Sequence, residues 1–145
     1  MPPLVRLYVK TSFAYFVAGF VLLALILLDR WLNVSRWLTV VEVSQVHLLV
    51  VGWITQLSVG VAYWMFPRLR KEDDPRPRGS NGLAWAVYLC LNAGLLLRLG
   101  AEPFCIMTGQ SWLAALVALA GLLQATAAVG FGWLIWARIR PLEPR

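Results

Sequence analysis

The sequence predicts an all-α membrane protein with four transmembrane helices. Hydrophobic residues make up 60% of the 145-residue chain and charged residues only 14%. A soluble domain of this length could not bury so much apolar surface. The hydrophobic residues gather into four long runs, so we expect a lipid bilayer as the environment. The net charge of +6 does not indicate a nucleic-acid partner, because the basic residues lie at the ends of these runs.

The first two predicted helices cover residues 11–28 and 43–66. The run 11–28 is apolar throughout and ends at Asp29, and its helix would be about 27 Å long, which matches the hydrocarbon core. No small-residue cleavage site follows, so we expect a retained helix rather than a signal peptide. Residues 31–41 contain tryptophans and are expected at the membrane interface. Pro67 closes the second run.

The third and fourth predicted helices cover residues 83–97 and 111–137. Residues 68–81 before them are rich in charge, proline and glycine, as is typical of a solvated loop. Residues 99–110 contain Pro103 and two glycines, and we expect them to form a turn. No internal repeat or low-complexity stretch divides the sequence, so we expect one four-helix domain over the whole chain.

The distribution of lysine and arginine predicts the orientation of the helices. Ten basic residues lie in the head, the loop after the second helix and the tail, against three on the opposite side. The ten are Arg6, Lys10, Arg68, Arg70, Lys71, Arg76, Arg78, Arg138, Arg140 and Arg145, and the three are Arg30, Arg36 and Arg98. Because loops rich in these residues stay in the cytoplasm, we expect both termini to be cytoplasmic in a bacterial inner membrane. The second helix then starts near the outer surface.

His47, the only histidine, lies near the start of the second helix. An ionisable residue in a transmembrane segment is costly, so its first interpretation is functional. Imidazole is a common axial ligand of haem iron, and one histidine provides one axial bond. The alternative is a structural histidine bonded to a neighbouring helix or to interfacial water, and the sequence leaves both open. Residues on the same helical face, at steps of three and four, could form a flat wall for a porphyrin: Val50, Ile54, Ser58, Val61 and Met65.

Arg98 and Glu102 are predicted at the outer end of the third helix, at the depth of His47. An arginine there could bind the propionates of a haem, because its planar fork fits carboxylates. The alternative is that Arg98 anchors the helix at the headgroups and pairs with Glu102, four residues away. Taken alone, the second interpretation is favoured.

Two further sets of residues indicate contacts between helices. Polar residues inside the spans should hydrogen-bond across helices, or could bind a quinone headgroup. They are Gln45, Thr55, Gln56, Asn92 and Gln124. A stripe of small residues on the fourth helix would let another helix approach closely, in the same chain or in another copy. It consists of Ala114, Ala118, Gly121, Ala125, Ala128 and Gly132.

Several chemistries have no support in the sequence. With one histidine, a copper centre or a bis-histidine haem site cannot be built from a single copy. The spacing of Cys90 and Cys105 matches no metal motif. There is no phosphate-binding loop, nucleophile elbow or covalent haem-attachment motif, so conventional hydrolase or transferase activity is not expected.

The second helix resembles helix two of the catalytic subunit of haem–copper oxidases and of the related NnrS-type membrane proteins. The pattern that carries this resemblance is His47, Gly52, Gln56, Gly60, Tyr63 and Met65-Phe66-Pro67. In those families the histidine near the outer end of this helix ligates a low-spin haem. The resemblance therefore implies that His47 is an axial ligand and that the chain corresponds to one four-helix arc of the oxidase architecture. The copper-binding histidines are absent, so oxygen reduction is not expected.

The leading hypothesis is thus a homo-oligomeric b-type haem protein, a dimer or trimer in which copies of His47 meet around haem b. It would transfer electrons, with a quinol or a cytochrome as redox partner, or bind a diatomic gas. We expect such a haem-binding protein rather than a complete oxidase. The alternative is a cofactor-free accessory subunit of a larger respiratory membrane complex. A transporter ranks last, because the polar residues do not line up into a path.

Overall fold

The computed structural model describes residues 1–34, 37–67, 78–136 and 138–139, and these residues form helices and short connections without a strand. Four helices are long and apolar enough to cross a membrane, which confirms the prediction of an all-α protein with four such helices. They are α1 (Pro3–Leu32), a composite second helix made of α3 (Glu42–His47), η1 (Leu48–Thr55) and α4 (Gln56–Met65), then α5 (Asn81–Thr108) and α6 (Ser111–Trp136). A short helix, α2 (Trp37–Val40), precedes the second long helix.

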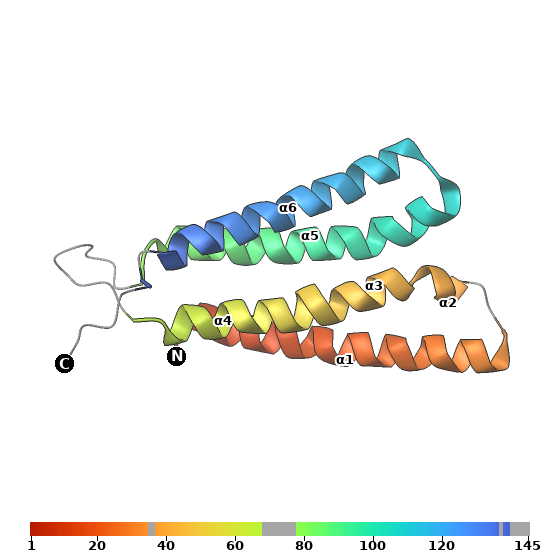
Figure 1. Ribbon diagram of the computed structural model, residues 1–145, viewed down its shortest axis with the longest axis horizontal. Coiled ribbons are helices and arrows are strands. Elements are labelled where there is room, and N and C mark those ends of the chain that lie inside the picture. The colour runs from red at the N-terminus through yellow and green to blue at the C-terminus, as the bar shows by residue number, and fades with distance from the viewer. Residues whose placement is uncertain (35–36, 68–77, 137, 140–145) are drawn as a thin grey trace.

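The four long helices are arranged as two antiparallel pairs (Figure 1). The helix α1 packs along the second long helix, and α5 packs along α6. The start of α1, the end of α4, the start of α5 and the end of α6 lie together at one end, which we call the basal end. The opposite end, with α2 and the connection between α5 and α6, is the distal end. The helical ends on either side of the charged segment 68–81 are therefore basal, although residues 68–77 lie outside the described part of the chain.

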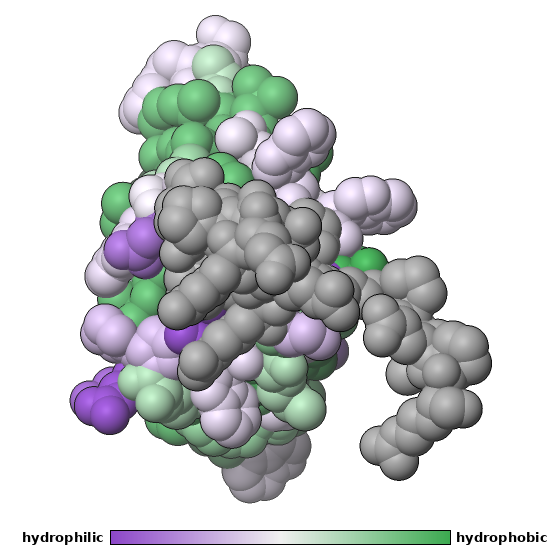
Figure 2. Space-filling model, turned by 90° about the vertical axis from the view of Figure 1, so that its left-hand side faces the viewer, coloured by the Kyte–Doolittle hydropathy of each residue, from purple (hydrophilic) through white to green (hydrophobic). Residues whose placement is uncertain are grey.

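The lateral surface of the bundle is strongly apolar. Large side chains such as Val17 on α1 and Leu122, Val129 and Trp133 on α6 are more than half exposed. A view onto the basal end shows hydrophobic residues reaching the outer edges of the molecule, with few strongly hydrophilic ones among them (Figure 2). A surface of this kind is compatible with lipid and not with water.

Glycines allow α1 to approach the second long helix closely. A Cβ atom placed on Gly60 would lie 2.6 Å from the Cβ of Tyr8, and one on Gly52 would lie 2.8 Å from the Cβ of Tyr15. Each tyrosine thus packs directly against the backbone of a glycine on the facing helix. Without a hydrophobic driving force between helices in lipid, such close contacts are a main source of association.

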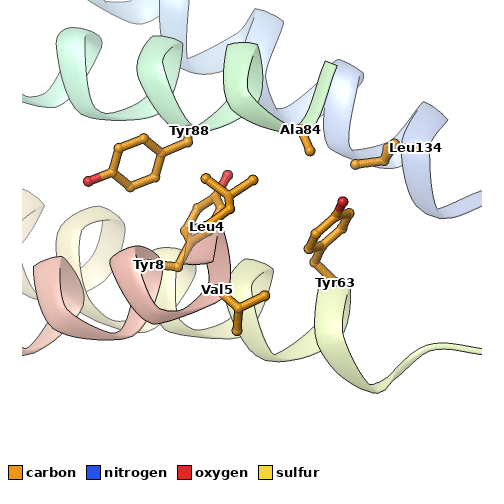
Figure 3. Close-up of a cluster of buried hydrophobic side chains, with 7 residues drawn as sticks. All are labelled: Leu4, Val5, Tyr8, Tyr63, Ala84, Tyr88 and Leu134. Atoms are coloured by element: carbon orange, nitrogen blue, oxygen red, sulfur yellow. The ribbon is translucent and has the colours of Figure 1, made fainter. Parts of the chain in front are cut away.

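A buried cluster at the basal end joins all four long helices (Figure 3). The rings of Tyr8 on α1 and Tyr88 on α5 meet edge to face, with 4.9 Å between their centroids. An aromatic pair of this geometry contributes about 0.5–1.5 kcal/mol beyond its buried area. The other members of the cluster are Leu4, Val5, Tyr63, Ala84 and Leu134.

The helix α6 packs against α5 through residues spaced by seven. The buried residues of this seam include Leu113, Ala120, Ala127 and Leu134. Gly94 of α5 lies over the backbone of Ala120, where a Cβ would come within 2.8 Å of the carbonyl oxygen. The predicted stripe of small residues lies on another face of α6, which is exposed or half-buried, and a Cβ on Gly121 or Gly132 would meet nothing within 4 Å. Within the described part of the chain, no other helix therefore packs closely on Gly121 or Gly132.

The third span is longer than predicted. The sequence predicted its end at residue 97 and a turn over residues 99–110, but α5 continues to Thr108 with Pro103 inside it. The prediction of a turn was wrong because only Gly109 has a positive φ, of 64°, and Gly100 is helical. Proline removes one backbone donor, a loss that a packed helix can tolerate. Cys105 consequently lies on a helix rather than in a loop.

We predict that Gly60→Ala lowers the free energy of unfolding by roughly 1–3 kcal/mol, because the new methyl group collides with the Tyr8 side chain close to its backbone. The matched control is Gly132→Ala on α6, where the methyl group meets open space and the effect should be neutral or slightly stabilising. Thermal unfolding in detergent, followed by circular dichroism, measures both. Equal effects of the two substitutions would contradict this packing.

Candidate functional site

The imidazole of His47 is oriented by the backbone of its own helix. Its Nδ1 atom lies 2.7 Å from the carbonyl oxygen of Val43, one turn earlier. A carbonyl oxygen only accepts hydrogen bonds, so Nδ1 of the neutral ring carries the proton and the lone pair is on Nε2. The side chain is 19% exposed, at the flank where α3 faces α5. Among the residues that the structure describes, none is recorded as a hydrogen-bond partner of Nε2.

Arg98 and Glu102 complete what we call the distal cluster, together with His47. The guanidinium of Arg98 donates from Nε to both carboxylate oxygens of Glu102 at 3.2 Å and from Nη2 to Oε1 at 3.0 Å. The Oε2 atom of Glu102 lies 3.9 Å from Nδ1 of His47, so α5 and the second long helix meet here through polar groups. Of the two roles considered for Arg98, the pair with Glu102 is present.

The π-helix η1 begins directly after His47. In it the Thr55 hydroxyl donates to the carbonyl oxygen of Val50, five residues earlier, at 2.8 Å. A π-turn holds more residues than an α-turn. Residues beyond Thr55 therefore face a different direction, relative to His47, than they would in a continuous α-helix. The predicted face through Ile54 and Ser58 assumed an α-helix throughout. Single π-turns are frequent at functional sites.

Ile54 and Ser58 lie on the outer surface of the bundle. Ile54 is 51% exposed, and Ser58 is exposed as well. Val50 and Met65 share this outer position. The structure thus brings His47, Arg98 and Glu102 together but leaves Ile54 and Ser58 on a surface strip, which a second molecule or a bound group would have to cover. Haem binding by these residues remains a prediction.

Gln56 and Asn92 hydrogen-bond to other helices, which is one of the two interpretations predicted for the polar residues of the spans. Thr55 instead bonds within its own helix, and Nε2 of Gln124 is buried without a partner among the described residues. The hydroxyl of Tyr15 donates to Oδ1 of Asn92 at 2.9 Å and so links α1 to α5. The side-chain amide of Gln56 donates to the hydroxyl of Thr11 and links α4 to α1. Neither contact is available to a quinone headgroup without breaking a bond between helices.

Sequence analysis missed the role of Arg138. This residue follows α6 and reaches across to the end of the second long helix, where Nη2 donates to the carbonyl oxygens of Tyr63 at 3.0 Å and Phe66 at 2.5 Å, and Nε donates to that of Pro67 at 3.0 Å. Its guanidinium also lies 5.4 Å from the centroid of the Tyr63 ring. Carbonyls at a helix end lack intrahelical donors, so Arg138 satisfies them. In the sequence it is one basic residue of a basic tail.

In the described part of the chain, no group of three or more His, Cys, Asp or Glu side chains comes together. His47 offers one nitrogen ligand.

Comparison of the chain with protein-family models, with curated proteins and with solved structures gives no match.

We predict a coupling free energy of about 1.5 kcal/mol between Arg98 and Glu102 in a double-mutant cycle with Arg98→Met and Glu102→Gln, because both side chains are largely buried and the hydrogen bonds are charged. The matched comparison is the Arg30–Glu42 pair, whose side chains are 51% and 46% exposed and whose coupling should stay below about 0.5 kcal/mol. Unfolding of the variants in detergent gives both values. A distal coupling no larger than that of the exposed pair would show that the distal cluster is solvated.

Proposed function

We propose that this chain is a membrane haem protein of the b type in which Nε2 of His47 is an axial ligand of the iron. The observation that carries this proposal is the hydrogen bond from Nδ1 of His47 to the Val43 carbonyl. Histidines that ligate metals usually donate their other ring nitrogen to a carbonyl or carboxylate, which fixes the tautomer and makes the ligating nitrogen more basic. The same arrangement leaves the lone pair of Nε2 free of partners in the described chain.

The neighbours of His47 support a haem rather than a bare ion. The bonds from Arg98 to Glu102 use Nε and Nη2, which leaves Nη1 of Arg98 to meet a propionate at the same depth. The strip formed by Val50, Ile54 and Ser58, on the helix that carries His47, offers a partly apolar surface. A bound haem would supply reversible one-electron chemistry, with a sixth position either filled by a second histidine or open to a diatomic gas.

We further propose a homo-oligomer, a dimer or trimer, as the functional form. A single copy contains one histidine and leaves the Ile54–Ser58 strip uncovered. A second copy would cover this strip and bring a second His47. The charge distribution supports placing the basal end in the cytoplasm of a bacterium and the distal cluster near the outer face of its inner membrane, where a quinol or a cytochrome could exchange electrons.

An accessory subunit without a cofactor is the second candidate. The exposed stripe of small residues on α6 favours it, because such a stripe fits a helix of a larger complex as well as a second copy. A subunit of this kind should be colourless after purification and should co-purify with a partner of different mass.

We predict that the protein, expressed with sufficient haem and purified in detergent, shows a Soret band and a reduced α band, and that His47→Leu loses about 90% or more of the bound haem because the axial bond is gone. In His47→Met the thioether replaces the imidazole, so haem is kept with a higher reduction potential. The control is Thr108→Val at the distal end, whose hydroxyl bonds only to the Phe104 carbonyl and whose spectrum should be unchanged.

Two further measurements sharpen the test. Free imidazole added to His47→Ala should restore the wild-type spectrum if the histidine is a ligand, and should have no effect if the histidine is structural. Native mass spectrometry then counts chains and haems in the assembly. Absence of a Soret band, or full haem content in His47→Leu, would refute the proposal.

A further inference from the structure

The basal end contains a cavity of about 480 Å³ beside the end of the second long helix. Its lining combines an arginine with apolar side chains and backbone: Trp64, Met65, Phe66, Pro67 and Arg78. Trp64 is 47% exposed and Met65 is 70% exposed, so one side of the cavity opens onto the lipid-facing surface. Tryptophan at this position is typical of the headgroup level of a bilayer.

A buried positive charge lies next to this cavity. Arg138 is 1% exposed, and its Nε bonds to the carbonyl oxygen of Pro67, which also lines the cavity. The partners of its guanidinium are carbonyl oxygens, and no carboxylate of the described residues forms an ion pair with it. Its Nη1 atom is buried without a hydrogen-bond partner. The carbonyls satisfy donors but do not cancel the charge.

Arg78 adds a second positive charge at the same place. Its Nε atom is also buried without a hydrogen-bond partner. Burial above all, and also the charge of Arg78, lower the pKa of Arg138, against the opposing effect of Tyr63. Both guanidinium groups therefore belong to this end of the second long helix: Arg78 lines the cavity, and Arg138 bonds to Pro67, which also lines it. Arginine donors left unfilled by the described residues, beside a cavity, are well placed to bind an anion.

We propose that this cavity binds a phosphate group, that of an anionic phospholipid headgroup, through the guanidinium of Arg78, with Arg138 contributing its charge from behind. Arginine is well suited to phosphate because its planar donors match two oxygens at once. Basic pockets between transmembrane helices are known sites for anionic lipid headgroups. Trp64 and Met65 would contact the glycerol and the first part of the acyl chains. This binding site does not depend on the proposed haem function.

The test uses the whole chain in detergent after removal of bound lipid. Phosphatidylglycerol is added to wild type, to Arg78→Gln and to Arg6→Gln, and bound lipid is counted by native mass spectrometry, with phosphatidylcholine as the uncharged competitor. Arg6 is an exposed arginine at the same end, so its variant loses the same charge outside the cavity. Arg138 is left intact because it caps α4. We expect Arg78→Gln to bind phosphatidylglycerol about tenfold more weakly than wild type and Arg6→Gln to stay within about twofold.

A separate arm adds inorganic phosphate without lipid and records the melting temperature. If phosphate alone raises the melting temperature of wild type but not of Arg78→Gln, the site binds phosphate and free phosphate is its ligand. If only phosphatidylglycerol raises the melting temperature in this way, the ligand is the lipid. The proposal is overturned if Arg78→Gln and Arg6→Gln lose binding equally, or if wild type binds neither anion.

Discussion

Polar side chains that bond to one another across helices hold this bundle together, because lipid provides no hydrogen-bond partners. Among the described residues, α1, α4 and α5 are linked by hydrogen bonds between side chains of different helices. Tyr15 is bonded to Asn92, and Gln56 to Thr11, so the middle of the bundle is held by amides and hydroxyls. Arg98 and Glu102 satisfy one another at the distal end, and Arg138 satisfies the carbonyls of α4 at the basal end. Steric fit at Gly52 and Gly60 then fixes how closely α1 can approach.

The need for a hydrogen-bond partner on protein also determines the orientation of the His47 ring. Nδ1 of His47 donates a hydrogen bond to the Val43 carbonyl of its own helix. The ring therefore does not need a neighbouring helix to orient it. Glu102 lies on the same side of the ring, at 3.9 Å, where its negative charge is largely compensated by Arg98. The ring edge with Nε2 is consequently the part of the side chain left for other partners. The π-helix η1 follows His47, so the side chains of α4 point in other directions than they would in a regular α-helix.

The sequence predicts those features that depend on hydropathy alone, and misses those that depend on contacts between distant residues. The four apolar runs identify the four helices, because crossing a bilayer requires length and apolar composition. The end of α5 was placed too early because Pro103 and Gly100 are turn residues in water but are accommodated in a packed membrane helix. His47 was singled out because it is the only histidine of the sequence, and its role stays a prediction. The role of Arg138 was missed, because nothing local in a basic tail indicates that this residue folds back onto Tyr63. The direction in which Ile54 and Ser58 face depends on the π-helix η1. A sequence pattern with steps of three and four residues describes an α-helix and does not reveal a π-helix.

The seven-residue spacing of the α6 seam has a consequence for the surrounding lipid. Leu113, Ala120, Ala127 and Leu134 repeat at the interval of a left-handed coil, so α6 turns slowly around α5 and keeps one line of contact with it. The small residues of the stripe repeat at the same interval and keep a constant angle to that line. The stripe residues Gly121, Ala128 and Gly132 are each followed by a large exposed side chain, namely Leu122, Val129 and Trp133. Acyl chains along this side of α6 therefore meet small and large side chains in alternation, whereas those along α1 meet Phe13, Phe20 and Leu28.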